Sequence, residues 1–461
     1  MEMYNTKTIT NISVVGLGKL GLCLAAVLAD RGFNVKGIEL DTTKVKAINS
    51  ATSPIYEPGL DELIKRNVHR LKATSDYSEG IEGTDATFVV VPTPSEEDGS
   101  FSLKFVLPAI NSIGEVLKKK EGYHLVVITS TVGPGSMDNV IKPLLESASG
   151  KVCGEELGLC YNPEFIALGD VIHGLLKPDF VLIGESDGRA GDVLSSIQKK
   201  VCLNDPPIER MEFVNAELAK IAVNSFVTMK MSFANTLAEI CERLPKGDVD
   251  KVTKAIGRDR RIGSAYLKGA LGYGGPCFPR DNIAFNRYAE SVGSQAVLAT
   301  STHKVNTMQV ERMIRLALKN GLHASMKVGI LGLSYKPNTN VVEESQALQL
   351  ASSLVDRGHS VFVFDPAAMA SARKVLGDRV KYANSALELV SMSDYIILAT
   401  PWNEFANLPV EAFSGKHVLD CWRFLPSRIA DVATYSAVGR SNEHRSDSML
   451  SVENMNSSSS V

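Results

Sequence analysis

The chain has 461 residues, of which 44% are hydrophobic and 22% charged, and its formal net charge is −3. This is the composition of a globular protein of roughly two to four domains. A near-neutral charge gives no long-range attraction to nucleic acid or a membrane surface, and no apolar run reaches the ~18 residues of a membrane span. We therefore expect a soluble enzyme without nucleic-acid or membrane partners.

The N-terminus and the cysteines indicate the compartment. Residues 1–10 are polar and lack the apolar core of a signal peptide. The seven cysteines are scattered and form no CxxC pair. This pattern fits reduced thiols better than a disulfide framework or a zinc site. We expect a cytoplasmic protein that binds no metal.

The first half alternates strand and helix patterns. Residues 11–15 read as a strand, 21–31 as a helix and 34–39 as a second strand. Later short apolar runs suit strands buried on both faces of a parallel sheet; they are 86–91, 125–129, 159–161 and 180–183. The pattern predicts a doubly wound α/β domain.

A dinucleotide fingerprint lies between the first strand and the first helix. Gly16, Gly18 and Gly21 have the GxGxxG spacing, which serves a tight turn, close approach of a pyrophosphate and helix–strand packing. Glu39 ends the second strand, where a carboxylate can bond both ribose hydroxyls and repel a 2′-phosphate. We therefore expect NAD rather than NADP.

Two further strands of the first half end at polar residues. Thr131 follows one of them, and Glu164 follows another in Asn162-Pro163-Glu164-Phe165. The carboxyl ends of parallel strands are where α/β sites lie, so Glu164 could be a general base and Thr131 its partner or a cofactor contact. A loop glutamate and a turn-capping threonine remain equally compatible with the pattern.

Residues 212–243 contain no glycine or proline and space their apolar residues by three and four. They predict one helix of about 30 residues, or ~45 Å, which we expect to connect domains and line a dimer interface. Lys220 and Asn224 share one face of it. A cation and an amide on one face could stabilise an oxyanion, although a solvated helix face is the alternative.

Cys277 lies behind a glycine-rich bend, in Gly272-Tyr273-Gly274-Gly275-Pro276-Cys277-Phe278-Pro279-Arg280-Asp281. Glycines let the backbone approach a ligand closely, and nearby cations such as Arg280 stabilise a thiolate. A placed thiol together with a dinucleotide site suggests oxidation through a sulfur-bound carbonyl.

A second α/β pattern begins at residue 326, with a strand and turn at 327–332 and strands at 361–366, 395–400 and 417–420. It reads as a weak internal repeat without a GxGxxG motif, so we expect it to bind a different nucleotide. Lys336 could face a phosphate there or be a solvated surface lysine. Residues 436–461 are rich in serine and asparagine and predict a disordered tail.

These patterns predict two Rossmann-like doubly wound α/β domains joined by a long central helix. The limits we expect are 1–205 for the NAD-binding domain and 206–310 for the helical dimerisation region with the catalytic cysteine. A second, C-terminal nucleotide-binding domain is expected at 311–435, followed by the tail at 436–461.

The motifs together resemble the UDP-glucose/GDP-mannose dehydrogenase family from about residue 11 to residue 423. The motifs that carry the resemblance are Gly16 to Gly21, Val91-Pro92-Thr93-Pro94, Ser130-Thr131-Val132, Asn162 to Phe165, Lys220 with Asn224, Arg261-Ile262-Gly263, Gly272 to Asp281, and Lys336-Pro337. The resemblance implies a four-electron oxidation of a sugar C6 alcohol to a carboxylate, using two NAD⁺ and one water.

The resemblance also implies roles for individual residues. Cys277 matches the nucleophile, Lys220 and Asn224 steady the oxyanion, Glu164 acts with Thr131 in acid–base steps, and Asp281 orients water. Arg261 would reach the substrate in the partner subunit of a homodimer or larger homo-oligomer. Further implied substrate contacts are Phe165, Tyr266, Lys268, Gly274, Tyr335, Lys336 and Arg423, and further implied cofactor contacts are Lys44, Thr93 and Thr131.

The chain departs from the family pattern at several positions. Arg280 stands where a lysine is usual, and arginine keeps the charge but cannot shuttle a proton. Leu168 stands where many members have a glutamate. The C-terminal motif of the family usually has an aspartate pair followed by an arginine, and this arginine touches the cofactor in some members. At these positions the chain has Asn340, Val341 and Glu343.

The function expected first is oxidation of UDP-glucose to UDP-glucuronate. The alternatives are a UDP-N-acetylhexosamine or GDP-mannose as substrate. Two other classes also stay open, a single-step hydroxyacid dehydrogenase and a non-catalytic nucleotide-binding protein.

Overall fold

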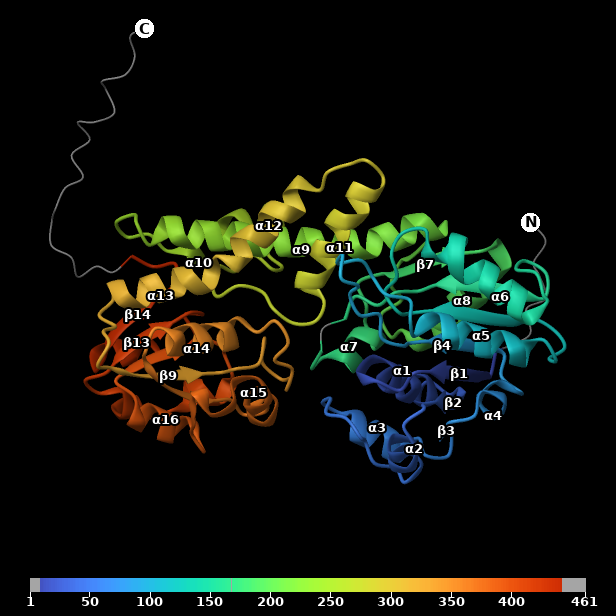
Figure 1. Cartoon of the computed structure of the whole chain (residues 1–461), viewed down its shortest axis with the longest axis horizontal. Helices are drawn as coiled ribbons and strands as arrows, with labels where there is room; N and C mark the ends of the chain where they lie inside the picture. Colours follow the sequence, from blue (N-terminus) through green and yellow to red (C-terminus); the bar gives the residue numbers. More distant parts are fainter. Residues whose placement is uncertain (1–8, 167, 442–461) are drawn as a thin grey trace, which may run out of the picture.

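The computed structural model describes residues 9–166 and 168–441. Two sheets flanked by helices lie side by side, and the long helix α9 (Phe213–Cys241) runs along both of them (Figure 1). This arrangement confirms the predicted fold class. Among the described residues, no helix combines the length and hydropathy needed to cross a membrane.

The N-terminal sheet has the strand order β3-β2-β1-β4-β5-β6-β7-β8. Its strands are β1 (Asn11–Val15), β2 (Asn34–Ile38), β3 (Leu71–Thr74), β4 (Ala86–Val89), β5 (His124–Ile128), β6 (Leu157–Tyr161), β7 (Val181–Glu185) and β8 (Ile208–Met211). Neighbours are parallel except β6 and β7, which pair antiparallel. The sheet therefore departs from the expected parallel arrangement at one pair. The expected limit at 205 is also too early, because β8 pairs with β7.

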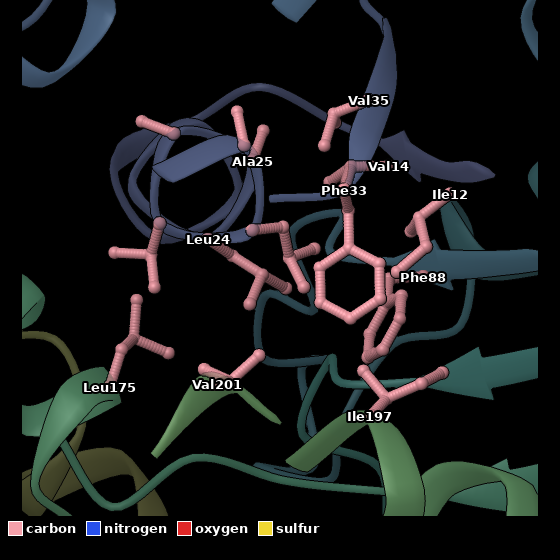
Figure 2. Packing of buried hydrophobic residues seen from close by; sticks show 14 of the residues in the cluster. Ile12, Val14, Leu24, Ala25, Phe33, Val35, Phe88, Leu175, Ile197 and Val201 are labelled. Atoms are coloured by element: carbon pink, nitrogen blue, oxygen red, sulfur yellow. The ribbon is translucent and has the colours of Figure 1, made fainter. Parts of the chain in front are cut away.

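Helices cover both faces of this sheet and bury its core. They are α1 (Lys19–Asp30), α2 (Thr42–Asn49), α3 (Leu60–Arg66), α4 (Tyr77–Ile81), α5 (Val106–Leu117), α6 (Lys142–Ser149), α7 (Val171–Leu176) and α8 (Gly188–Val201). In Figure 2, apolar side chains from α1, α7, α8 and strands β1, β2 and β4 converge on one cluster. Burial of such side chains supplies most of the favourable free energy of folding, and here it fixes α1 against β1.

The C-terminal sheet has the order β11-β10-β9-β12-β13-β14, which repeats the order of the first six strands of the N-terminal sheet. Its elements are β9 (Lys327–Leu331), α14 (Gln346–Asp356), β10 (Ser360–Phe364), α15 (Met369–Leu376), β11 (Lys381–Tyr382), α16 (Ala386–Met392), β12 (Tyr395–Leu398), β13 (His417–Asp420) and β14 (Thr434–Ala437). All its neighbouring strands are parallel. The predicted internal repeat is thus confirmed as a shared topology.

The expected start of the tail at residue 436 is wrong. Ser436 and Ala437 belong to β14 and pair with β13, and Val438 is buried. Arg440 then lies 3.7 Å from the carboxylate of Asp248. These residues are ordered by tertiary contacts that their composition does not reveal. Residues 442–461, the rest of the predicted tail, lie outside the described residues.

The central region packs against α9. It consists of α10 (Val249–Ile256), α11 (Phe278–Ser291), α12 (Val297–Thr307) and α13 (Gln309–Lys319). The long predicted helix is confirmed, since α9 spans 29 residues. One of its faces is buried and polar, with Glu217, Lys220, Asn224, Thr228, Ser232 and Asn235. The functional side chains of α9 therefore point inward.

The acids that end the second strand of each sheet are used differently. Asp365, which follows β10, is 1% exposed. One of its oxygens accepts hydrogen bonds from the backbone N–H groups of Leu333 and Ser334, and the other accepts from Ala367 and Ala368. Both oxygens of this carboxylate thus bind groups of its own domain. These hydrogen bonds fix the loop that leads to Tyr335 and Lys336.

We predict that Asp365→Ala lowers the stability of the C-terminal domain by about 3 kcal/mol, because buried N–H groups lose their acceptor. The measurement is chemical unfolding followed by circular dichroism. The control is Asp378→Ala, which removes an exposed carboxylate of the same domain. Equal stability of the two variants would contradict the structural role of Asp365.

Candidate active site

The glycines of the first turn form a cradle for a phosphate group. Gly16 has φ +89°, donates its N–H to the carbonyl of Ile38 at 2.8 Å, and would bring a Cβ within 2.6 Å of the carbonyl oxygen of Val90. At Gly18 a Cβ would meet no described atom within 4 Å, so open space lies in front of it. At Gly21 a Cβ would collide with the carbonyl oxygen of Gly16. These residues fit a pyrophosphate bound at the N-terminus of α1.

Glu39 and Lys44 lie together beyond the end of β2. The side chain of Glu39 is 13% exposed and accepts a hydrogen bond from the backbone N–H of Asp41 at 3.1 Å. The Nζ of Lys44 is 3.3 Å from the other carboxylate oxygen of Glu39. The structure therefore holds Glu39 at the strand end where a ribose would be read, with Lys44 as its ion-pair partner.

Lys220 and Glu164 meet at the floor of the site. The Nζ of Lys220 donates to the backbone carbonyl of Glu164 at 2.6 Å and lies 4.6 Å from the ring centre of Phe165. Lys220 is 7% exposed, so its helix face is not solvated. Burial lowers the pKa of Lys220, and the nearby Asp281 carboxylate opposes this shift most strongly. Burial also raises the pKa of Glu164 to about 7, against the effect of Lys220.

Asn224 and Asp281 join α9 to α11. The Nδ2 of Asn224 donates to one oxygen of Asp281 at 2.6 Å, and both residues are buried. Arg280 donates from Nε to the other oxygen at 3.1 Å and from Nη1 to the backbone carbonyl of Thr93 at 3.1 Å. Arg280 thus links the cofactor domain to the helix that follows the cysteine. The sequence marked Arg280 as a cation near the thiol and as a departure from the family pattern, but it did not reveal this link between the two segments.

Cys277 immediately precedes α11 and has exposed surface. The protein around it nevertheless desolvates the thiol, and this burial raises its pKa. Arg280 and Lys220 oppose the shift, while Asp281 and Glu343 add to it. Burial and the two cations therefore shift the pKa of Cys277 in opposite directions, and a base beside the sulfur would favour the nucleophilic thiolate.

The glycine bend before Cys277 touches the C-terminal domain. Gly275 has φ +85°, and a Cβ there would lie 2.6 Å from the ring of Tyr335. Its N–H donates to the carbonyl of Glu343 at 3.0 Å. At Gly274 a Cβ would collide with the carbonyl oxygen of Glu344. Glycines are required in this bend because the segment 335–344 of the C-terminal domain packs directly against it. The same packing places Tyr335 beside the cysteine loop.

The loop that carries Thr131 is fixed by Glu217. Thr131 is half-buried after β5. Glu217, fully buried on α9, accepts hydrogen bonds from the backbone N–H groups of Gly135 at 2.6 Å and Met137 at 2.8 Å. Glu217 therefore positions this loop over the helix face that carries Lys220. Its spacing of three residues from Lys220 is the signal that could have identified Glu217, since residues three apart share a helix face.

The remaining predicted substrate contacts are spread around the site. Tyr266 has φ +60° and packs edge-on against Phe278, with ring centres 6.3 Å apart. Lys336 is half-buried, and this burial lowers its pKa. The carboxylate of Glu57, in the N-terminal domain, acts in the opposite direction and raises the pKa of Lys336. Lys268 is exposed.

Two predicted contacts do not join the cluster around Cys277. The side chain of Arg261 is 89% exposed and pairs with Asp259 at 2.7 Å. Arg423 donates to both oxygens of Asp250, at 2.8 and 3.0 Å, and to the carbonyl of Val438 at 2.7 Å. Its side chain is 1% exposed. These bonds hold the guanidinium of Arg423 between the C-terminal sheet and α10.

Three profiles of the UDP-glucose/GDP-mannose dehydrogenase family match the chain in succession. The NAD binding domain matches residues 10–202, the central domain 214–308 and the UDP binding domain 329–427. The central match contains Lys220, Asn224 and Cys277, and the last one contains Tyr335 and Lys336.

Full-length relatives agree with these matches. The chain is 38% identical over 422 residues to UDP-glucose 6-dehydrogenase AglM of Haloferax volcanii, covering 90% of this chain and 97% of that protein. It is 32% identical over 434 residues to GDP-mannose 6-dehydrogenase of Pseudomonas savastanoi pv. phaseolicola, covering 91% and 98%. The solved UDP-glucose dehydrogenase of Pyrobaculum islandicum superposes with a TM-score of 0.87 at 34% identity, covering 96% and 100%. The chain belongs to the UDP-glucose/GDP-mannose dehydrogenase family and is an NAD-dependent nucleotide-sugar 6-dehydrogenase.

Proposed function

We propose that the protein oxidises UDP-glucose at C6 to UDP-glucuronate, with Cys277 as the covalent nucleophile. The observation that carries this proposal is the convergence of Cys277, Lys220, Asn224 and Asp281 where α9 meets α11. The choice of sugar is supported by relatives whose names specify UDP-glucose, at 38% and 34% identity.

The first oxidation removes the hydroxyl proton and a hydride from C6 and leaves an aldehyde. When bound along the Gly16 to Gly21 turn, NAD⁺ is the hydride acceptor. We propose that Glu164 and Thr131 hold or accept the proton, while Lys220 and Asn224 stabilise the negative oxygen. The Nζ of Lys220 is buried beside Glu164, and this burial lowers the pKa of the ammonium group.

The aldehyde then adds to Cys277. The sulfur forms a bond to C6, its proton passes to a base, and the oxygen becomes the hydroxyl of a thiohemiacetal. The thiohemiacetal then loses its hydroxyl proton to a base and a second hydride to a second NAD⁺, which would bind at the same glycine turn, and a thioester remains. Water, oriented by Asp281, attacks C6, the C–S bond breaks, and the carboxylate leaves as the thiol is restored.

We predict that Cys277→Ser lowers acid formation by roughly 10⁴-fold or more, because the covalent nucleophile is lost. NADH binding should stay unchanged. The measurement is NADH produced per UDP-glucose, expected at two for the parent, with chromatography of the sugar product. Cys153→Ser, a half-buried cysteine of the N-terminal domain, is the control. Normal acid production by Cys277→Ser would exclude the covalent mechanism.

GDP-mannose is the second candidate, because GDP-mannose 6-dehydrogenases are 32% identical over nearly their whole length. UDP-N-acetylhexosamines complete the set of substrates to compare. A panel of these nucleotide sugars decides among them. NADH formation with one of the others, and none with UDP-glucose, would reject our first choice.

Glu164 should impose a pH dependence on the reaction. Its pKa is raised to about 7 by burial, so the carboxylate that serves as a base is lost as pH falls through about 7. We predict that kcat/KM rises with pH across this range and that Glu164→Gln removes this limb. Glu155→Gln, which changes an exposed glutamate, should keep it. An unchanged profile in Glu164→Gln would assign the titration to another group.

We propose that a second copy of the chain covers the outer face of α9. Phe226, Phe233 and Ile240 lie seven residues apart along this face and are 58%, 53% and 47% exposed. A row of exposed large apolar side chains opposite a buried face indicates an interface, and a twofold axis would let the same row cover itself. In such a dimer the exposed Arg261 would reach the neighbouring active site.

We predict that the double variant Phe226→Asp with Phe233→Asp is monomeric and loses most of its activity. Light scattering after gel filtration measures the mass, and NADH formation measures turnover. Leu318→Asp, at an apolar side chain on α13 that is 47% exposed, is the matched control. A monomeric parent protein, or a dimeric double variant, would rule out this interface.

We also propose a cytoplasmic location. All seven cysteines are unpaired, as expected for a reducing compartment.

A further inference from the structure

Lys19 connects the cofactor turn to the C-terminal domain. It is the first residue of α1, directly after Gly18, and its Nζ donates to the Oδ1 of Asn340 at 2.8 Å. Asn340 lies in the same loop as Tyr335 and Lys336, which border the cysteine loop and the N-terminal domain. One hydrogen bond therefore spans the two nucleotide domains beside the phosphate cradle.

The surroundings of Lys19 are unfavourable for a cation on its own. The N-terminus of a helix carries a partial positive charge, and Gly18 has no side chain to cap it. The first turn reads Lys19, Leu20, Gly21 and Leu22, and so contains no acid. Asn340 is neutral and leaves the ammonium charge uncompensated. Burial of the half-buried ammonium also lowers the pKa of Lys19.

The carboxylate of Glu57 acts on Lys19 but does not fully compensate its charge. Glu57 opposes the pKa shift of Lys19, but its two oxygens accept the backbone N–H groups of Gly169 at 3.0 Å and Val171 at 2.9 Å. The negative charge of Glu57 therefore also stabilises the N-terminus of α7 and interacts favourably with Lys336. An anion bound in front of Gly18 would be favoured for three reasons. The ammonium of Lys19 is half-buried, the N-terminus of α1 is uncapped, and the space at Gly18 is open.

We propose that Lys19 is a positioning residue with two partners. It binds the pyrophosphate of NAD and, through Asn340, ties the bound cofactor to the C-terminal domain. Cofactor binding thereby favours the arrangement in which Tyr335 and Lys336 stand beside the cysteine loop. The amide of Asn340 is suited to this task, because a carboxylate there would neutralise Lys19 and repel the phosphate.

The second domain contact in this region supports the coupling. Gly169, just before α7, lies against the backbone of Asn338, and a Cβ at Gly169 would collide with the Asn338 carbonyl oxygen. The loop that holds Asn340 is therefore already close-packed on the N-terminal domain. A small change in how Lys19 is bound would be transmitted to that loop without a large motion.

The test measures NADH binding by fluorescence, without turnover. Lys19→Met should weaken NADH binding by about 10- to 100-fold, the effect of losing a hydrogen bond to a charged group. Asn340→Ala should bind NADH within about twofold of the parent, since the cation remains. Asn340→Asp should weaken binding about 10-fold, because it pairs with Lys19. The control is Lys72→Met, which removes an exposed lysine from β3 and should change nothing.

The coupling is measured by repeating the titration with saturating UDP-glucose, which NADH cannot oxidise. This arm rests on the proposed substrate. The parent should bind NADH more tightly in its presence, and both Lys19→Met and Asn340→Ala should lose this gain. Parent-like NADH affinity in Lys19→Met, or full coupling in both variants, would overturn the inference.

Failure of the proposed substrate would look different. The parent alone would then show no calorimetric binding of UDP-glucose, while Lys19→Met would still weaken NADH binding. Thermal unfolding of each variant separates both results from misfolding, since Lys19 lies at a helix end and its loss should leave the melting temperature within a few degrees of the parent.

Discussion

The buried polar face of α9 is the constraint on which the rest of the site depends. A polar or charged group removed from water must find a partner or it costs stability. Along α9, Glu217 takes its partners from the loop after β5, Lys220 from the loop after β6, and Asn224 from α11. One helix thus gathers three segments that are distant in sequence, and the reacting groups are brought together by the same bonds that satisfy its buried face.

The two nucleotide domains share a topology but not a chemistry. In the first, the acid after the second strand stays at the ribose end of the cradle, with Lys44 as its partner. In the second, the corresponding Asp365 is buried under backbone N–H groups and shapes a loop instead. That loop leads to the residues that cover the cysteine bend. The N-terminal domain of the repeat therefore supplies the cofactor site. The C-terminal domain supplies the loop that packs against the cysteine bend.

Much of this could be predicted from local patterns in the sequence. Glycine spacing gave the phosphate turn, because only glycine tolerates the backbone conformation and close contacts at Gly16 and Gly21. Short apolar runs predicted most of the strands but not β3, β8, β11 or β14, and an uninterrupted helical period predicted α9. Lys220 and Asn224 were predicted to share a face because four residues make about one helical turn. The family followed from the order of these motifs along the chain.

What the sequence by itself determined is therefore the set of elements, the cofactor turn and the reacting residue types, since each depends on neighbours a few positions apart. Only the tertiary structure decided which groups meet and how far water is excluded from them. In the folded chain Arg423 forms an ion pair with Asp250, and Asn340 accepts a hydrogen bond from Lys19. Ser436 and Ala437 pair with a neighbouring strand. The tertiary structure also raised the pKa of Cys277 despite two nearby cations, because desolvation depends on all the atoms around a group and not on its sequence neighbours.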